Sequence, residues 1–160
     1  MNKFILPLIA LVLAAFMIYR TWNNHKASEQ NFAIGQTFLA ENGQKEGVIT
    51  TESGLQYLVL HKAEPSDEHK KPQSESKITV HYEGKLIDGT VFDSSIERGA
   101  PISFALNQVI KGWQEGMLLM SVGDKYRLFV PSTLGYGTKG TGPIPPSSVL
   151  IFDVELIDVQ

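Results

Sequence analysis

The sequence contains no cysteine, little net charge and no cluster of basic residues. The absence of cysteine excludes a disulfide framework, a cysteine nucleophile, a cysteine-bound metal and a thioether lipid anchor. The formal net charge is only −3, and there is no patch of lysine and arginine of the kind that binds nucleic acid. We therefore expect neither a cysteine-based site nor a nucleic-acid partner.

Histidine is scarce as well. His25, His61, His69 and His81 do not follow the spacing of metal ligands, so the sequence predicts no metal site, and we expect no cofactor. The chain has 160 residues, of which 42% are hydrophobic. This length and composition suit one globular domain with an appendage.

The one long hydrophobic run lies at the N-terminus, where residues 4–19 (FILPLIALVLAAFMIY) carry no charge. Such a segment is either a cleaved signal peptide or an uncleaved membrane anchor. Ala14 and Ala15 offer no clean small-x-small cleavage pattern, because the bulky Phe16 and Met17 follow at once. The run is shorter than the roughly 20 residues that span a bilayer.

The residues at the end of the run favour the anchor. Arg20 can extend its charge to the interface, and Tyr19 and Trp22 are suited to the level of the lipid headgroups. We therefore interpret residues 1–22 as a signal-anchor that enters the membrane through its apolar part. A cleaved signal peptide is the alternative.

Residues 23–51 are predicted to form a linker that contains one short amphipathic helix. Ser28 is expected to cap this helix, and an Asn-Gly pair is expected to end it. Phe32, Gly35 and Leu39 fall on one face, which must be buried against something. The partner of that face is the main domain, a second copy of the chain or the bilayer surface, and the sequence does not choose among them.

Residues 52–160 are predicted to form the folded domain. Apolar and polar residues alternate with the period of a strand in six stretches, at residues 55–59, 78–82, 91–93, 102–106, 126–130 and 149–158. Asp88 and Gly89 are typical of a hairpin turn between the second and third of these. Residues 61–76 are charged and nearly free of apolar side chains, and residues 132–148 are rich in glycine and proline, so both indicate loops.

One helix is predicted inside this domain, beginning near Val109. Trp113, Gly116, Met117 and Met120 share a face at the helical period, and a glycine follows shortly after. Strands combined with a single helix indicate an α+β domain, in which an antiparallel sheet folds over the helix. Taken alone, Trp113 is interpreted as a core residue of this helix.

Two polar residues of the domain stand out by their positions. Asp93 follows Phe92 directly, at the end of a segment that should be buried. By itself, Asp93 would be interpreted as a turn residue that caps the serine pair after it. Tyr136 lies between two glycines in a loop, where packing offers little reason for a tyrosine, so a functional role is favoured.

Three segments in order, VHYEGKLIDGTVFDSS, VIKGWQEGMLLMSVGDKYRLFVP and YG…IPPSSVLIFDVEL, resemble the FKBP-type peptidyl-prolyl cis-trans isomerases. The resemblance covers residues 54–159. It implies a twisted antiparallel sheet of five to six strands wrapped around one short α-helix, preceded by the apolar helix and the short amphipathic helix. The lead-in at residues 31–57 is similar to that of bacterial members related to the macrophage infectivity potentiator. Little chain separates it from the apolar run, so the oligomeric state is left open.

The resemblance also implies the site, an apolar cavity without a metal or cofactor. It assigns a catalytic role to Tyr82, Phe92, Asp93, Trp113 and Tyr136. It assigns substrate binding to Phe104, Val109, Ile110, Ile144, Phe152, Arg98 and Ile102. Arg98 matches a family position whose charge pairs near the cavity, and the backbone N–H of Ile110, at the helix start, is free to donate to a ligand.

Two features depart from the family's pattern. Ile102 stands where many cytosolic members have an aromatic residue, and the loop at residues 136–145 is about one residue shorter than in the best-known members. The preference for the residue before proline and the affinity for macrolides therefore stay open.

The activity implied by the resemblance is the cis-trans isomerisation of X–Pro bonds. The expected partners are proline-containing unfolded or nascent exported polypeptides, with rapamycin-like macrolides as possible ligands. The expected location is the bacterial inner membrane, as a single-pass protein with its domain in the periplasm, or the periplasm itself after signal cleavage. Two other functions stay open for this fold, a peptide-binding or chaperone module with little turnover and a docking face for assembly.

Overall fold

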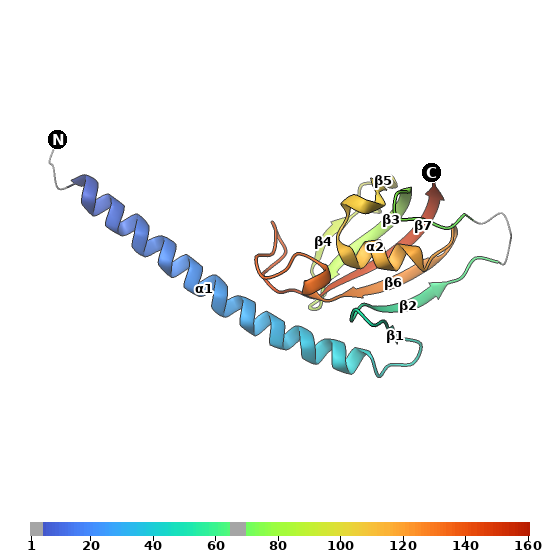
Figure 1. The fold of residues 1–160 in the computed structure, drawn as a ribbon, viewed down its shortest axis with the longest axis horizontal. Helices are drawn as coiled ribbons and strands as arrows, with labels where there is room; N and C mark the ends of the chain where they lie inside the picture. The colour runs from blue at the N-terminus through green and yellow to red at the C-terminus, as the bar shows by residue number, and fades with distance from the viewer. Residues whose placement is uncertain (1–4, 65–69) are drawn as a thin grey trace.

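The computed structural model describes residues 5–64 and 70–160 of the chain (Figure 1). The predictions made for residues 1–4 of the apolar segment and for residues 65–69 of the charged loop lie outside the described residues. The described part consists of one long N-terminal helix and an α+β domain, with the helix running from beneath the domain outward beyond it.

The N-terminal helix α1 (Ile5–Asn42) is continuous over 38 residues, or about 57 Å. The two helices that the sequence predicts separately are therefore one helix. The reason lies in the connecting residues 20–27 (RTWNNHKA), which contain neither glycine nor proline and give the helix no reason to stop. Ser28 accordingly lies inside the helix and does not cap it.

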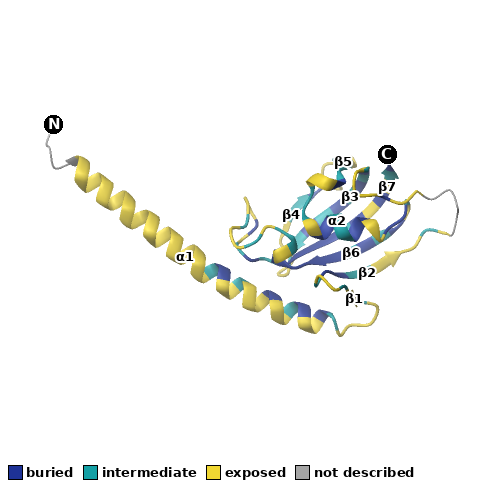
Figure 2. Ribbon diagram, viewed as in Figure 1, coloured by how far each residue is buried: buried dark blue, intermediate teal, exposed yellow. Residues whose placement is uncertain are grey.

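The two halves of α1 differ in their surroundings (Figure 2). Residues 6–26 are exposed on all sides, whereas one face of the second half is buried against the domain. That face is formed by side chains three or four residues apart, Ser28, Asn31, Gly35, Phe38, Leu39 and Asn42. The partner of the face is therefore the chain's own domain. Phe32, predicted on the buried face, is 45% exposed because it lies on the flank of the stripe.

The domain is built on a seven-stranded antiparallel sheet in the order β1-β2-β6-β7-β3-β4, with β5 paired to β3. The strands are β1 (Ile49–Thr50), β2 (Gln56–His61), β3 (Lys77–Leu86), β4 (Val91–Ser94), β5 (Ile102–Ala105), β6 (Lys125–Val130) and β7 (Leu150–Val159). The predicted α+β class is confirmed. The strands β2 to β7 correspond to the six predicted stretches, and the two-residue strand β1 is the one strand beyond the predicted five to six.

Helix α2 (Lys111–Leu118) covers one face of this sheet, where the main core lies. The 3₁₀ turn η1 (Leu106–Gln108) precedes α2, and a second 3₁₀ turn, η2 (Ser132–Leu134), follows β6. Gly112 and Gly116 let the helix approach β6 closely, because a Cβ at these positions would lie 2.5 Å from Val130 and 2.8 Å from Leu128. The predicted helix over this segment is confirmed, with its start at Lys111.

The opposite face of the sheet is covered by α1. Leu39 of α1 forms a second cluster there with Phe129, Val149 and Ile151. A Cβ on Gly35 would lie 2.8 Å from Val149, so the helix touches the segment just before β7. The sheet is thus packed on both faces, and this arrangement fixes the side of α1 that faces the domain.

Candidate active site

A cavity of about 300 Å³ opens between α2 and the sheet. It is lined by Tyr82, Phe92, Asp93, Phe104, Gln108, Val109, Ile110, Trp113, Tyr136 and Phe152. The structure thus brings together nine of the twelve residues that the sequence analysis singled out. They come from β3, β4, β5, α2, β7 and the loops before and after, so the folded sheet is required to assemble them.

Aromatic rings pack edge-on around Trp113, which is 4% exposed. The ring of Tyr82 lies 5.2 Å from it at 88°, that of Phe104 5.8 Å at 86°, and that of Phe152 5.3 Å at 85°. Edge-to-face packing of this kind is favourable and holds each ring in one orientation. The indole therefore belongs to the core through most of its surface and also forms part of the cavity wall.

The indole Nε1–H of Trp113 is buried and has no hydrogen-bond partner among the described residues. An unpaired buried donor costs about 1–3 kcal/mol and is rare in folded proteins. Among the described residues, the indole is therefore held by ring packing and not by a hydrogen bond from its nitrogen.

Asp93 and Phe92 both line the cavity, although consecutive residues of a strand normally point to opposite faces. The strand register explains this: Gly84 pairs with Asp93 while the next residue, Lys85, pairs with Val91. Phe92 is therefore the extra residue of a β-bulge, and bulges of this kind redirect side chains beside functional sites. The bulge brings a carboxylate and a phenyl ring to the same cavity.

Gly84 makes room for this arrangement. A Cβ at this position would lie 2.6 Å from the ring of Phe92 and 2.8 Å from that of Phe152. The two rings meet edge-on at 5.6 Å directly over the glycine. The absence of a side chain on β3 at this point therefore sets the position of one wall.

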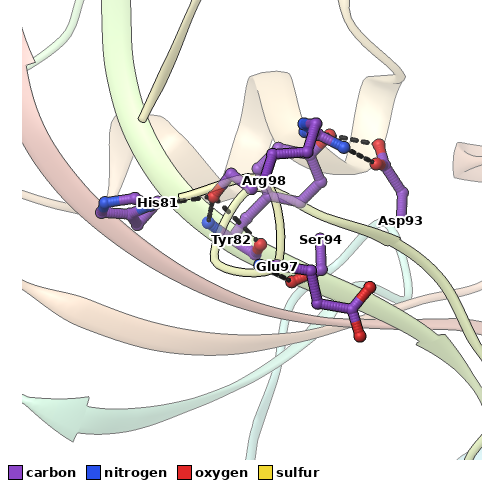
Figure 3. Close-up of polar contacts among 7 residues, drawn as sticks. His81, Tyr82, Asp93, Ser94, Glu97 and Arg98 are labelled. Atoms are coloured by element: carbon purple, nitrogen blue, oxygen red, sulfur yellow. Dashed lines mark hydrogen bonds and ion pairs between the residues drawn. The ribbon is translucent and has the colours of Figure 1, made fainter. Parts of the chain in front are cut away.

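The polar part of the rim is a triad of Tyr82, Asp93 and Arg98 (Figure 3). The Tyr82 hydroxyl donates to one carboxylate oxygen of Asp93, and Arg98 donates to the other. A second guanidinium nitrogen of Arg98 lies 3.3 Å from the Tyr82 hydroxyl. Both oxygens of Asp93 are thus held by donors, which fixes the carboxylate at the cavity edge.

The ionisation of this triad follows from its contacts. Burial raises the pKa of the Tyr82 phenol above its ordinary value of 10.0, and the hydrogen bond to Asp93 raises it further. Burial alone would also raise the pKa of Asp93, but the bonds from Tyr82 and Arg98 outweigh it and hold that pKa below 3.8. The bond to Asp93 raises the pKa of Arg98. Near neutral pH, Tyr82 is a neutral donor between two charged residues.

Ser95 anchors the triad and was missed by the sequence analysis. Its buried hydroxyl accepts a hydrogen bond from the Tyr82 N–H at 2.8 Å, and its own N–H donates to the Tyr82 carbonyl at 2.9 Å. It also lies 3.0 Å from a ring nitrogen of His81. The turn that carries Arg98 is thereby tied to β3. The only signal in the sequence was the serine pair after Asp93, which was interpreted as part of a turn.

Two further donors face the cavity. Ile110 precedes the first residue of α2, and in the described part of the chain nothing accepts a hydrogen bond from its backbone N–H. Tyr136 lies in the loop after η2, and its side chain is 41% exposed. The cavity therefore presents one main-chain donor and one phenol to anything that enters it.

Three predicted residues lie outside the cavity wall. Arg98 acts on it only through Asp93 and Tyr82. Ile102 packs against the edge of the main core, and Ile144 is only 6% exposed and belongs to that core. Conversely, Gln108 lines the cavity but was not predicted, although it lies next to Val109, which was.

Two family models match the chain. The model described as FKBP-type peptidyl-prolyl cis-trans isomerase matches residues 68–157, and the model described as the domain amino terminal to FKBP-type peptidyl-prolyl isomerase matches residues 9–59. Among curated proteins, the FKBP-type isomerase FkpA of Aeromonas hydrophila is 50% identical over 84% of this chain. The outer membrane protein MIP of Legionella longbeachae is 41% identical over 90% of this chain.

The solved structures agree with these matches. The crystal structure of FkpA from Escherichia coli superimposes with a TM-score of 0.86 at 37% identity, over 95% of this chain and 71% of that one. A peptidyl-prolyl isomerase from Pseudomonas syringae superimposes with a TM-score of 0.75 at 34% identity, over 83% and 96% of the two chains. The chain spans only 49% and 60% of the lengths of the Aeromonas and Legionella relatives.

Proposed function

Because this chain belongs to the FKBP-type peptidyl-prolyl cis-trans isomerase family, we propose that it catalyses the cis-trans isomerisation of X–Pro bonds in polypeptides. The observation that carries this proposal is the aromatic cavity against Trp113, rimmed by Asp93 and Tyr136. Its size and apolar wall suit a pyrrolidine ring, and its few donors suit one amide carbonyl.

The reaction needs only help in twisting the amide. The cis and trans forms of an X–Pro bond differ little in energy, but a barrier of about 18–20 kcal/mol separates them because resonance stiffens the C–N bond. The twisted amide has lost that resonance and is less polar than the planar one. An apolar enclosure therefore disfavours the planar ground state more than the twisted state, which lowers the barrier.

The donors and the carboxylate orient the substrate in this scheme. The phenol of Tyr136 and the N–H of Ile110 can each bind a carbonyl oxygen and fix the residue before or after proline. Asp93, held by Tyr82 and Arg98, places a negative charge near the amide and disfavours the planar carbonyl oxygen. No proton transfer is involved, in keeping with an ionised Asp93 and a neutral Tyr82 near neutral pH.

The substrates we propose are unfolded or nascent exported polypeptides that contain proline. Helix α1 supports this proposal, because it is long and apolar enough to cross a membrane and its apolar stretch is not buried. We assign it as an uncleaved anchor in the inner membrane with the domain in the periplasm, in preference to a soluble periplasmic form after cleavage. Rapamycin-like macrolides would compete for the same cavity.

The test of the activity is a proline-isomerisation assay on the full chain in detergent, with Trp113→Phe alongside. We expect the chain to accelerate isomerisation of a short X–Pro peptide, and the variant to lose about tenfold in kcat/KM, which corresponds to about 1.4 kcal/mol. Leu118→Ala, at an exposed position of the same helix, is the control and should keep wild-type activity. Peptide binding without any acceleration would replace the isomerase by a binding module.

The proposed location has its own test. Spheroplasts of cells that express the full chain are treated with an external protease, and membranes are extracted with alkaline carbonate. We expect the domain to be digested from outside and the α1 fragment to stay with the membranes. Protection of the domain in intact spheroplasts would contradict the periplasmic assignment, and release of the uncleaved chain by carbonate would contradict the anchor.

A further inference from the structure

The loop at residues 135–148 is attached to α1 at its base. The Ser28 hydroxyl in α1 lies 2.7 Å from that of Ser147, and both residues are buried. One turn further along α1, the Asn31 side-chain amide donates to the Pro146 carbonyl at 2.8 Å. These bonds join residues more than one hundred positions apart in the chain, and in Figure 1 the loop lies beside α1.

Ser147 adopts a backbone conformation that serine seldom adopts. Its φ is +53°, and it is the one non-glycine residue with positive φ in the described part of the chain. Such a conformation costs of order 1–3 kcal/mol and persists only where surrounding contacts enforce it. Here the contacts are the hydroxyl pair with Ser28 and the bond from the Ser147 N–H to the Gly137 carbonyl at 2.9 Å.

The bond between Ser147 and Gly137 transmits this attachment to the cavity. Gly137 directly follows Tyr136, whose side chain lines the cavity, so the constrained base of the loop ends beside a wall residue. The loop between these points is tightly folded: Thr141 and Ile144 form a bridge, and a Cβ on Gly140 would lie 2.2 Å from the Ile144 carbonyl. A displacement of its base would therefore reach Tyr136.

We propose that the second half of α1 is a positioning element of the active site, in which Ser28 and Asn31 hold the loop that presents Tyr136. This inference rests on the proposed isomerase function and adds to it a role for a helix that does not touch the substrate. Gly35 is part of this positioning element, because its lack of a side chain lets α1 contact Val149 at the end of the loop. Membrane attachment and cavity geometry then share one rigid element.

The test compares the full chain in detergent with the double variant Ser28→Ala/Asn31→Ala. The variant leaves the loop without its two bonds to α1, so Tyr136 is presented less often in its binding position. We expect KM for an X–Pro peptide to rise by about three- to tenfold with kcat nearly unchanged, the range that two modest hydrogen bonds represent. The matched control is Gln30→Ala/Thr37→Ala, on the exposed face of the same helix, which should behave as wild type.

A second readout follows the loop directly. Lys139 is exposed and is the one lysine or arginine between residues 132 and 148, so trypsin cleavage after it reports the mobility of the loop. We expect this cleavage, identified by the mass of the 140–160 fragment, to be about three- to tenfold faster in the double variant. Asn42→Ala, which removes the bond from α1 to Gln56 at 2.9 Å, away from the loop, should lower stability and leave both KM and this cleavage rate unchanged.

A double-mutant cycle with Tyr136→Ala separates positioning from a general effect. If α1 acts through Tyr136, removing the phenol first makes the α1 substitutions nearly silent in KM. Full additivity, or wild-type KM and cleavage rate in the double variant, would overturn the proposal. The proposed function itself fails in a different way, through an inactive wild-type chain, so the two failures are distinguishable.

Discussion

The phenol of Tyr82 in β3 donates to the carboxylate of Asp93 in β4, although the strand partner of Asp93 is Gly84. Tyr82 and Gly84 are two residues apart and face the same side of the sheet, and a cross-strand partner faces that side as well. The carboxylate therefore points to the cavity because of the register, and the bulge at Phe92 adds a ring beside it. The pairing of β3 with β4 thus explains why the Asp93 carboxylate lies at the cavity.

Removal of the Asp93 carboxylate is expected to lower activity more than stability. In Asp93→Ala, Tyr82 and Arg98 lose their common acceptor, and charge-assisted bonds are worth about 1.5–3 kcal/mol. We expect kcat/KM to fall by about ten- to a hundredfold, and Asp93→Asn, which keeps one acceptor for Tyr82, to fall less. Asp88→Asn, in the exposed hairpin turn, is the control. Unchanged activity in Asp93→Ala would remove this residue from the mechanism.

The pH dependence of kcat/KM is expected to be flat across the neutral range. Asp93 has its pKa lowered below 3.8 in the folded state, so it keeps its charge until the pH falls below that value. Tyr82 has its pKa raised above 10.0, so it stays a donor until the pH exceeds that value. A pH–rate profile between about pH 5 and 9 tests this. A bell-shaped profile centred near pH 7 would instead indicate acid–base catalysis.

Gly84→Ala is expected to distort the cavity from within the sheet. The new methyl group would overlap the rings of Phe92 and Phe152 and push them from their edge-on arrangement. Overpacking of this kind costs about 1–3 kcal/mol, so we expect a lower thermal midpoint together with a several-fold loss of kcat/KM. Glu83→Ala is the control, because Glu83 is the neighbouring residue and faces the other side of β3. Similar losses in both variants would show that the effect is not specific to the cavity.

The buried Asp124 gives a stability prediction away from the site. Its carboxylate is fully buried and accepts from Lys62 at 2.6 Å, from the N–H of Ala63 at 2.9 Å and from that of Ser121 at 2.9 Å. Asp124→Asn replaces an acceptor oxygen by a donor and should lower the free energy of unfolding by about 1–3 kcal/mol. Lys62→Met leaves this buried carboxylate without its cation and should lower the free energy of unfolding at least as much.

The difference in the free energy of unfolding between wild type and Asp124→Asn should depend on pH, and the pKa shift gives the sign. Burial opposes the charge of Asp124, but the bonds from Lys62 and the backbone outweigh it, so the folded-state pKa lies below 3.8. The stabilisation is complete above the unfolded pKa of about 3.9 and is lost as the pH falls through the folded value. Denaturant unfolding of wild type and Asp124→Asn is measured between pH 3 and 7. Their free energies of unfolding should converge only at the acidic end of this range. A constant difference would contradict the pKa shift.

The strands and α2 could be predicted from the sequence because their patterns are local. The alternation around Tyr82 and the helical spacing around Trp113 depend on which neighbours are apolar, and the fold keeps both. The end of α1 at Asn42 was also predicted, from the Asn-Gly pair, but its continuity through Ser28 could not be found in this way. Serine is favoured at the N-cap of a helix, so Ser28 was predicted as a cap. No residue just before it breaks the helix, however. Its hydroxyl instead forms a hydrogen bond with that of Ser147, from a distant part of the chain.

The cavity also contains both residues that could be predicted from the sequence and residues that could not. Residues carried over from a resemblance, such as Phe104 and Val109, lie in its wall, but Ile144 is turned into the core by the tight loop around it. Gln108 lines the cavity only because a 3₁₀ turn precedes α2, and the sequence gives no clear sign of that turn. The bulge at Phe92 could not be predicted either, because bulges depend on pairing with another strand.

The unbroken course of α1 limits where the domain can act. From Arg20 to Ser28 the helix rises about 12 Å, with no glycine or proline at which it could swivel. With its apolar end inserted in a lipid bilayer, the domain would be carried on a short stiff stalk and not on a flexible tether. The proposed substrates would then be drawn from a thin layer next to the lipid surface rather than from the whole compartment.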